Sequence, residues 1–348
     1  MVIGIWSLWN WFVPRTRLAP SPTGALHLGN VRTFLANWAL ARQQGWQIVL
    51  RIEDLDGPRI KAGAAAEAID LLAWLGLDWD EGPHYQLSDL APYRAALDRL
   101  IAAGCAYPCR CTRREIEAAQ LSAPHGDAHE LRYPGACRPT NGADGNPRAG
   151  EAPAEPMRVA STGSAGASPS PGADGAAAYR LLVPDGATAF EDQFHGRHLY
   201  DLSAATGDFL VATKEGLPSY QLAVVVDDAR QGIDRVVRGD DLLSSTHRQR
   251  LLYERLQLGP PPQYWHLPLV VGADGRRLAK RHGDTRVAHY REAGVPAERI
   301  LALIARWCGL GEPQSITAAA FAEQFDLDKL PRTPITFAAA DDAWLRGQ

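Results

Sequence analysis

The stretch Ala19-Pro-Ser-Pro-Thr-Gly-Ala-Leu-His-Leu-Gly-Asn30 lies between a short predicted strand and a predicted helix, and it decides the fold. The helix ends near Gly45, and its apolar face is formed by Val31, Phe34, Leu35 and Trp38. Residues 47–52 then form a buried strand. Strand, helix and strand in this order make a βαβ unit, which predicts a parallel sheet with its ligand crevice at the carboxyl ends of the strands.

The turn before this helix has the properties of a phosphate site. Gly24 and Gly29 permit tight backbone turns, and Gly29 also lets a nucleotide lie against the chain. The start of the helix offers free N–H groups and a partial positive charge to phosphate. His27 can donate a hydrogen bond to phosphate oxygens. Taken alone, however, one histidine in a Pro/Gly turn is more often just a turn.

A second candidate is the basic loop Arg276-Arg-Leu-Ala-Lys-Arg-His282, which follows a Gly-Ala-Asp-Gly turn. Four cations in a flexible loop after a buried strand can close over a polyphosphate, with Lys280 as a movable point charge. The competing interpretation is a solvated basic loop, which is more common for such runs.

The cysteines favour a metal site in a reduced, cytoplasmic compartment over a disulfide scaffold, because the chain has only five in 348 residues. Cys109, Cys111 and Cys137 are close in sequence, and with a fourth donor they would satisfy tetrahedral zinc. Three buried, reduced thiols are the alternative. By ligand preference alone, His125 or His129 would be the fourth donor.

Charge and hydropathy exclude two classes of protein. A formal net charge of −4 argues against a globally basic nucleic-acid coat, although a local basic face remains compatible with it. No apolar run reaches the roughly 18 residues of a membrane span, so no membrane partner is expected.

Further along the chain, helices are expected at 64–77, 89–103 and 246–256, and strands at 220–226, 235–238 and 265–271. The pattern predicts an α/β fold: a Rossmann-type parallel-sheet catalytic domain with a zinc-containing insertion and a short helical C-terminal region. The expected parts are an N-terminal extension at 1–14, the two catalytic halves at 15–104 and 179–284, a zinc-binding insertion at 105–178 with a disordered segment at 141–178, and a helical region at 285–348.

The two candidate phosphate motifs together resemble the paired signatures of class I aminoacyl-tRNA synthetases, most closely the glutamyl group. The resemblance covers residues 15–310 apart from 141–178. Further matches recur in the same order, namely Arg17-x-Ala-Pro-Ser-Pro-Thr-Gly24, Arg51-Ile-Glu-Asp-Leu-Asp56, Gly76-Leu-Asp-Trp-Asp-Glu-Gly82, Ala223-Val-Val-Val-Asp-Asp228 and His266-Leu-Pro-Leu269.

The resemblance implies a set of site residues. Arg17 and Arg238 would hold the carboxylates of glutamate, Glu53 would receive its amino group, Tyr220 would close the pocket, and the floor would be lined by Ala19 and Ser21. ATP with Mg²⁺ would be bound by His27, Gly29, Asn30 and Lys280, of which His27, Asn30 and Lys280 would be catalytic. One structural zinc would be held by Cys109, Cys111, Cys137 and, as the resemblance implies, Tyr133. The competing interpretations are a strand-end salt bridge for Glu53 and Arg238 and a core aromatic for Tyr220.

Within the glutamyl group, the chain resembles the glutamyl-Q tRNA(Asp) synthetases. These enzymes activate L-glutamate without tRNA and attach it to queuosine in the anticodon of tRNA(Asp). Only 68 residues follow Lys280, which leaves no room for the anticodon-binding part of glutamyl-tRNA synthetases. Val224, where those enzymes usually have Asn, points the same way. The loop departs from Lys-Met-Ser-Lys-Ser and lacks a hydroxyl at Ala279.

A cytoplasmic monomer that uses ATP, glutamate and queuosine-containing tRNA(Asp) is therefore expected. Three alternatives remain open from the sequence. They are a shortened glutamyl-tRNA synthetase that charges the 3′ end of tRNA(Glu), a nucleotidyltransferase, and an inactive zinc-containing RNA-binding paralogue.

Overall fold

The computed structural model describes residues 13–22, 25–55, 60–121, 132–139, 176–276, 278 and 284–348. None of the helices in these ranges is long and apolar enough to cross a membrane.

The βαβ unit predicted from the sequence is present. β1 (Arg15–Leu18), α1 (Leu28–Gln44) and β2 (Gln47–Ile52) follow one another, and β1 pairs in parallel with β2. α1 ends where Gly45 adopts a left-handed φ of 67°, a conformation that glycine adopts without steric cost. α2 (Ala64–Trp74) then leads to β3 (Glu81–Tyr85), which pairs in parallel with the other side of β2.

A second sheet contains four strands in the order β7 (Gly196–Tyr200), β6 (Thr188–Asp192), β10 (Gln263–Leu267) and β9 (Arg235–Gly239). β10 runs parallel to both of its neighbours, whereas β6 and β7 form an antiparallel hairpin. The amide of Asp234, just before β9, donates to the carbonyl of Arg15 in β1 at 3.1 Å, so the two sheets adjoin there. From β1 the strand order continues to one side through β2 and β3, and from β9 it continues to the other side through β10. A crevice forms where the strand order reverses in this way, and α/β proteins bind ligands there.

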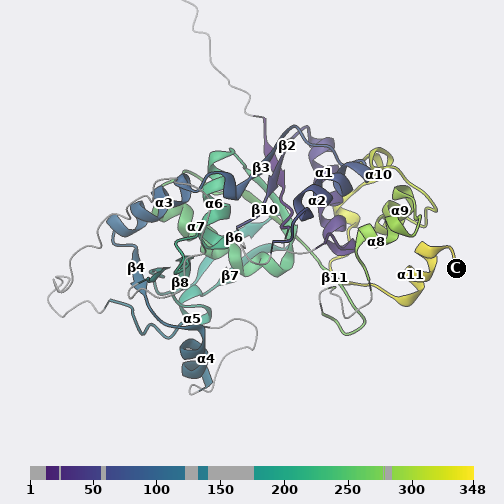
Figure 1. The fold of residues 1–348 in the computed structure, drawn as a ribbon. Coiled ribbons are helices and arrows are strands. Elements are labelled where there is room, and N and C mark those ends of the chain that lie inside the picture. The colour runs from purple at the N-terminus through teal and green to yellow at the C-terminus, as the bar shows by residue number, and fades with distance from the viewer. Residues whose placement is uncertain are drawn as a thin grey trace, which may run out of the picture.

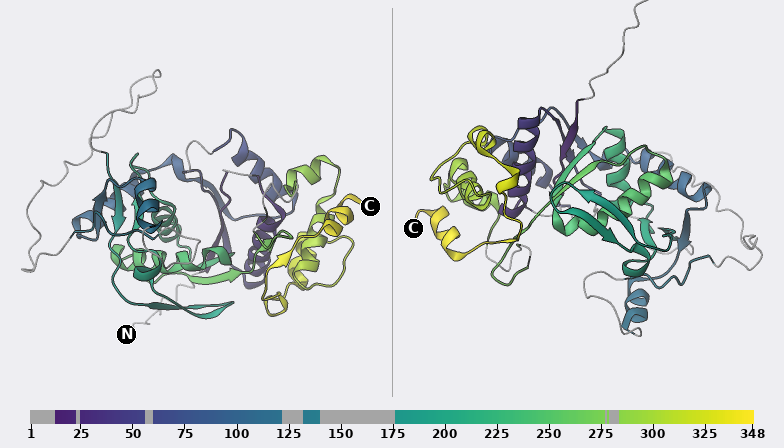
Figure 2. Two further views of the ribbon diagram at one scale, coloured as in Figure 1. Left: turned by 90° about the horizontal axis from the view of Figure 1, so that it is seen from below. Right: turned by 180° about the vertical axis from the view of Figure 1, so that it is seen from behind.

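The central strands β1, β2, β9 and β10 are largely buried and lie between two helical layers (Figures 1 and 2). Ile48, Leu50 and Ile52 of β2 share one apolar cluster with α1 and α2. On the opposite side lie α6 (Tyr220–Arg230) and α7 (Leu243–Leu256), and α3 (Ala91–Ala102) packs against these two helices. Alternate side chains of one strand therefore point into different layers.

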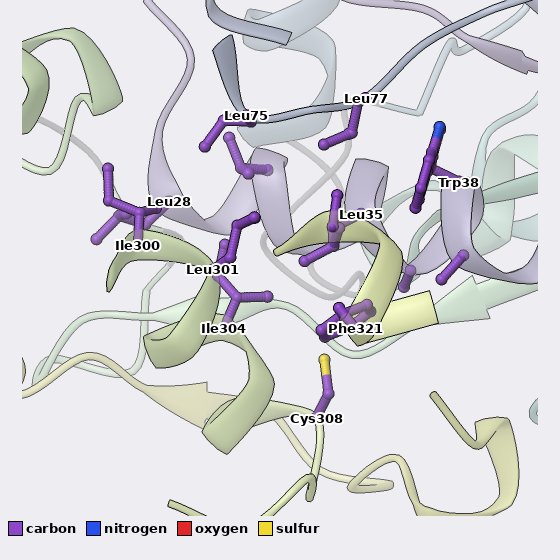
Figure 3. Packing of buried hydrophobic residues seen from close by; sticks show 14 of the residues in the cluster. Leu28, Leu35, Trp38, Leu75, Leu77, Ile300, Leu301, Ile304, Cys308 and Phe321 are labelled. Atoms are coloured by element: carbon purple, nitrogen blue, oxygen red, sulfur yellow. The ribbon is translucent and has the colours of Figure 1, made fainter. Parts of the chain in front are cut away.

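The C-terminal helices extend the first layer. They are α8 (Val287–Glu292), α9 (Ala297–Trp307), α10 (Ala318–Gln324) and α11 (Ala339–Arg346). Figure 3 shows Leu28, Leu35 and Trp38 of α1 packed with Ile300, Leu301 and Ile304 of α9 and with Phe321 of α10. β11 (Val270–Val271) also pairs in parallel with β12 (Ile335–Thr336). The predicted helical region after Thr285 is thus present and packs against α1.

A small antiparallel sheet, at the lower left of Figure 1, packs against α3, α6 and α7 through one shared apolar cluster. Its strands are β4 (Ala106–Cys109), β5 (Ala178–Leu181) and β8 (Phe209–Ala212), with β5 in the middle. The short helices α4 (Arg113–Leu121) and α5 (Leu202–Ala205) accompany it. Single 3₁₀ turns occur at Gln86–Ser88, Asp240–Leu242 and Leu327–Lys329. Most of the expected disordered segment at 141–178 lies outside the described residues.

One predicted strand is wrong. Residues 220–226 begin helix α6, whose N-cap is Ser219; its hydroxyl accepts from the amide of Leu222 at 3.4 Å. Leu222 through Val226 are all buried, so the run has no polar face that would reveal helical periodicity. The predicted strand at 265–271 is instead two strands, β10 and β11, in separate sheets. The remaining predicted helices and strands agree with the structure to within a few residues at their ends.

Candidate active site

One cavity of about 550 Å³ lies at the carboxyl ends of β1 and β9. It brings together nine of the ten residues predicted to bind glutamate or ATP, namely Arg17, Ala19, Ser21, His27, Gly29, Asn30, Glu53, Tyr220 and Arg238. The tenth, Lys280, lies outside the described residues, and so do Gly24, His125 and His129. Motifs that are far apart in the sequence therefore meet around a single space.

The N-terminus of α1 forms one end of this cavity. His27 is the N-cap residue, and its backbone amide lies 3.4 Å from the side-chain oxygen of Asn30. Nδ1 of His27 is 3.0 Å from Oγ1 of Thr285, and the Leu28 amide donates to the Thr285 carbonyl at 3.1 Å. The segment after the basic loop thus fixes the histidine, a contact that the sequence did not predict.

A buried charge network lies behind the cavity. Nη1 of Arg51 donates to Oδ1 of Asp228 at 2.8 Å, and Nη2 is 3.3 Å from Oε1 of Glu53. Nε of Arg17 is 3.5 Å from the same Asp228 oxygen. Burial raises the pKa of the Glu53 carboxyl, and the neighbouring guanidinium groups of Arg51 and Arg17 oppose that shift. Glu53 thus belongs to an ion-pair network and also lines the cavity.

Arg238 is held differently, because no carboxylate pairs with it in the described part of the chain. Its Nε donates to Nε2 of His266 at 3.0 Å, and its Nη2 donates to Oγ1 of Thr246 at 2.8 Å. Its Nη1 is buried and has no hydrogen-bond partner among the described residues. A strand-end salt bridge therefore does not account for this arginine.

Tyr220 is the first residue of α6 and remains 40% exposed while it lines the cavity. It is not an ordinary core aromatic, which was the competing interpretation of this position. Its ring is available to cover a bound molecule.

The cysteine cluster is a separate site beside the small antiparallel sheet. The sulfur atoms of Cys109, Cys111 and Cys137 all lie within 4.8 Å of one another. Oη of Tyr133 is 3.5 Å from Sγ of Cys109 and 3.8 Å from Sγ of Cys111. The four residues predicted as metal ligands thus converge on one point.

Several residues of the site were missed by the sequence reasoning. Arg51, Asp228 and His266 stand inside motifs that were quoted, but they were given no role. Asp192, whose Oδ2 lies 2.6 Å from Nδ1 of His266, belongs to no motif. Only tertiary structure reveals this partner, because Asp192 is 74 residues away from His266 in the sequence.

Comparisons with known proteins show the family of this chain. Residues 14–160 and 168–341 match the family described as class I tRNA synthetases (E and Q), catalytic domain. A glutamyl-Q tRNA(Asp) synthetase of Symbiobacterium thermophilum is 42% identical over 95% of this chain and 98% of its own length. A glutamate–tRNA ligase of Geotalea uraniireducens is 36% identical over 95% of this chain, which spans 65% of that enzyme.

The fold is also similar to a solved structure. The crystal structure of a glutamate tRNA ligase from Elizabethkingia meningosepticum, in complex with its amino acid, superposes with a TM-score of 0.73 at 25% identity. The match covers 95% of this chain and 68% of that one. This chain therefore belongs to the class I tRNA synthetases of the E and Q group, and it is similar over nearly its whole length to the glutamyl-Q tRNA(Asp) synthetases.

Proposed function

We propose that the chain activates L-glutamate with ATP in the absence of tRNA and transfers the glutamyl group to queuosine in the anticodon of tRNA(Asp). One observation carries this proposal: a single cavity is lined by two buried arginines, a carboxylate and the N-terminus of a helix. Relatives that match 95% and 91% of the chain bear the name of this activity.

Glutamate has two carboxylates and one ammonium group, and the cavity offers a partner for each. Arg17 and Arg238 supply guanidinium groups, whose planar fork suits carboxylate oxygens. Glu53 supplies a carboxylate for the ammonium group. Tyr220 covers the bound amino acid from the first turn of α6, and Ala19 and Ser21 form the floor.

The nucleotide binds at the start of α1. There His27, Gly29 and Asn30 line the cavity, and the helix end favours phosphate. A Cβ built on Gly29 would come no closer than 3.4 Å to the protein, which is ordinary contact, so protein packing does not demand glycine there. A nucleotide lying against the backbone would require glycine at this position. Leu278 lines the cavity and Thr285 holds His27, so the described residues on both sides of Lys280 adjoin the nucleotide site.

The reaction then has two steps. An oxygen of the glutamate α-carboxylate attacks the α-phosphorus of ATP, the bond to the β-phosphate breaks, and pyrophosphate leaves. His27, the amides near Gly29 and Lys280 stabilise the charge on the phosphates, so positioning and electrostatics supply the catalysis. A hydroxyl of the cyclopentene-diol of queuosine next attacks the activated carbonyl carbon, and AMP leaves. We assign no protein base to that step.

Zinc is proposed at the cysteine cluster, within the insertion at 105–178. In a tetrahedral site, Zn–S bonds of about 2.3 Å set the sulfur atoms about 3.8 Å apart. Sγ of Cys111 and Sγ of Cys137 are 3.5 Å apart, and Tyr133 offers a phenolic oxygen as fourth donor. The donor set therefore fits zinc, whose role would be to hold the insertion together.

The decisive assay is glutamate-dependent ATP–pyrophosphate exchange, measured with and without tRNA. The proposal predicts full exchange without tRNA, followed by transfer of labelled glutamate to tRNA(Asp) that carries queuosine and not to the same tRNA without it. The second candidate function is that of a glutamyl-tRNA synthetase, because the chain is 36% identical to a glutamate–tRNA ligase. Exchange that requires tRNA(Glu), with labelled glutamate attached to the 3′ end of that tRNA, would establish this function instead.

A further inference from the structure

We propose that Asp192 and His266 are positioning residues that hold the Arg238 guanidinium in the orientation that binds a substrate carboxylate. This inference rests on the proposed function and adds to it the residues that orient the specificity-determining cation. The three side chains come from the adjacent strands β6, β10 and β9, and they form a row of carboxylate, imidazole and guanidinium across the sheet.

The guanidinium of Arg238 has only one nitrogen available for a ligand. Nε donates to His266 at 3.0 Å, and Nη2 donates to Thr246 at 2.8 Å. The buried Nη1 has no hydrogen-bond partner among the described residues, although the side chain lines the cavity. Because two nitrogens are fixed by the protein, the plane of the fork is fixed as well, and Nη1 can serve the substrate without reorganisation.

His266 can accept a hydrogen bond from Arg238 only in one tautomer. Its Nε2 needs a lone pair to receive the Nε–H of Arg238, so its proton must be on Nδ1. Asp192 sets this tautomer, because its Oδ2 lies 2.6 Å from Nδ1 and a carboxylate only accepts. Both side chains are completely buried, so no water substitutes for either partner.

The other oxygen of Asp192 has a separate task. Oδ1 accepts from the amides of Phe194 and His195 at 3.0 and 2.8 Å, which fixes the turn between β6 and β7. The two oxygens therefore separate the structural role of Asp192 from its effect on the histidine. This separation allows a substitution that changes one role and keeps the other.

The test uses Asp192→Asn in the full-length chain. The asparagine oxygen can keep both turn amides, whereas its NH₂ group now donates to Nδ1 of His266. The imidazole proton is thereby forced onto Nε2, where it opposes the Nε–H of Arg238. Because a hydrogen bond to a charged group contributes about 1.5–3 kcal/mol, the KM for glutamate should rise about 10- to 100-fold. The KM for ATP and the melting temperature should stay close to those of the parent chain.

A second variant, His266→Gln, can keep both hydrogen bonds of the histidine although its side chain has no tautomers. A glutamine amide can donate to Asp192 and accept from Arg238, so its effect on the KM for glutamate should be smaller than that of Asp192→Asn. The effects of Asp192→Asn and His266→Gln on the KM for glutamate should be less than additive, because both act through the same hydrogen bond to Arg238, which can be lost only once. His247→Gln is the matched control: His247 is equally buried and bonded to Thr188 and His198, but it does not contact Arg238.

Three outcomes are distinguishable. If the unsubstituted chain shows no glutamate-dependent ATP–pyrophosphate exchange, the proposed function itself is refuted. Active parent chain with an unchanged KM for glutamate in Asp192→Asn would refute the positioning role alone. Equal increases in the KM for ATP and for glutamate, or strictly additive effects in the double variant, would assign Asp192 and His266 to the fold and overturn the inference.

Discussion

Replacing Arg238 by alanine tests the site most directly, because this arginine has no carboxylate partner in the described part of the chain. Nη1 carries two hydrogens, both available to a substrate carboxylate. Two charge-assisted hydrogen bonds of about 1.5–3 kcal/mol each give about 3–6 kcal/mol, or roughly a 10²- to 10⁴-fold loss in kcat/KM for glutamate. The KM for ATP should be almost unaffected.

The assay is ATP–pyrophosphate exchange as a function of glutamate concentration, with thermal unfolding as the check on the fold. Arg238→Lys keeps the charge but loses the fork that bonds His266 and Thr246, so its loss should be intermediate. Arg235→Ala is the matched control, because Arg235 precedes Arg238 in β9, bonds to Asp234 and does not line the cavity. A folded Arg238→Ala variant with the parental kcat/KM for glutamate would refute the assignment.

Three further predictions follow from the same contacts. Asp228→Asn should lower the free energy of unfolding in urea by about 3–5 kcal/mol, because the buried guanidinium groups of Arg17 and Arg51 lose their shared counter-charge. Asp78→Asn, at an exposed ion pair, is the control and should lower it by less than about 1 kcal/mol. Equal losses in the two variants would contradict the buried network. Cys109→Ser combined with Cys111→Ser should abolish stoichiometric zinc in metal analysis, and retained zinc would exclude the cluster as its site. Burial raises the pKa of Glu53, and only its ionised carboxylate can bind an ammonium group. On acidification, kcat/KM for glutamate should therefore begin to fall at a pH above the ordinary pKa of a glutamate side chain. An identical pH profile in Glu53→Gln would disprove this role of Glu53.

The parts of the fold that the sequence predicted are those with a clear period or end signal. The helix 28–44 combines an apolar face with a glycine at its end, and β2 is a short apolar run between polar segments. β3 has the sequence Glu-Gly-Pro-His-Tyr, with five exposed residues and no apolar alternation, so nothing in its pattern indicates a strand. Its place in the sheet depends on pairing with β2.

For the site, the sequence pointed to the residues that line the cavity but not to the residues that support them. The residues that line the cavity stand in motifs, and their roles follow from the resemblance to a known family. Their supporting partners do not, because Arg51 and Asp228 are 177 residues apart in the sequence and meet only when α6 packs on the sheet.

Three buried arginines at or behind the cavity, Arg17, Arg51 and Arg238, differ in how far the protein compensates their charge. Arg51 and Arg17 share Asp228, and Glu53 lies beside Arg51, so these cations are largely compensated within the protein. Arg238 bonds instead to a histidine and a threonine. Burial lowers the pKa of that histidine to about 4, so it is neutral near pH 7 and adds no second positive charge beside the arginine. No carboxylate among the described residues compensates Arg238, and burying an uncompensated cation is costly, so a substrate carboxylate would remove that cost. If Arg238 is the cation that receives the side-chain carboxylate, the neutral amide of glutamine would leave its charge uncompensated, and the contact would favour glutamate over glutamine.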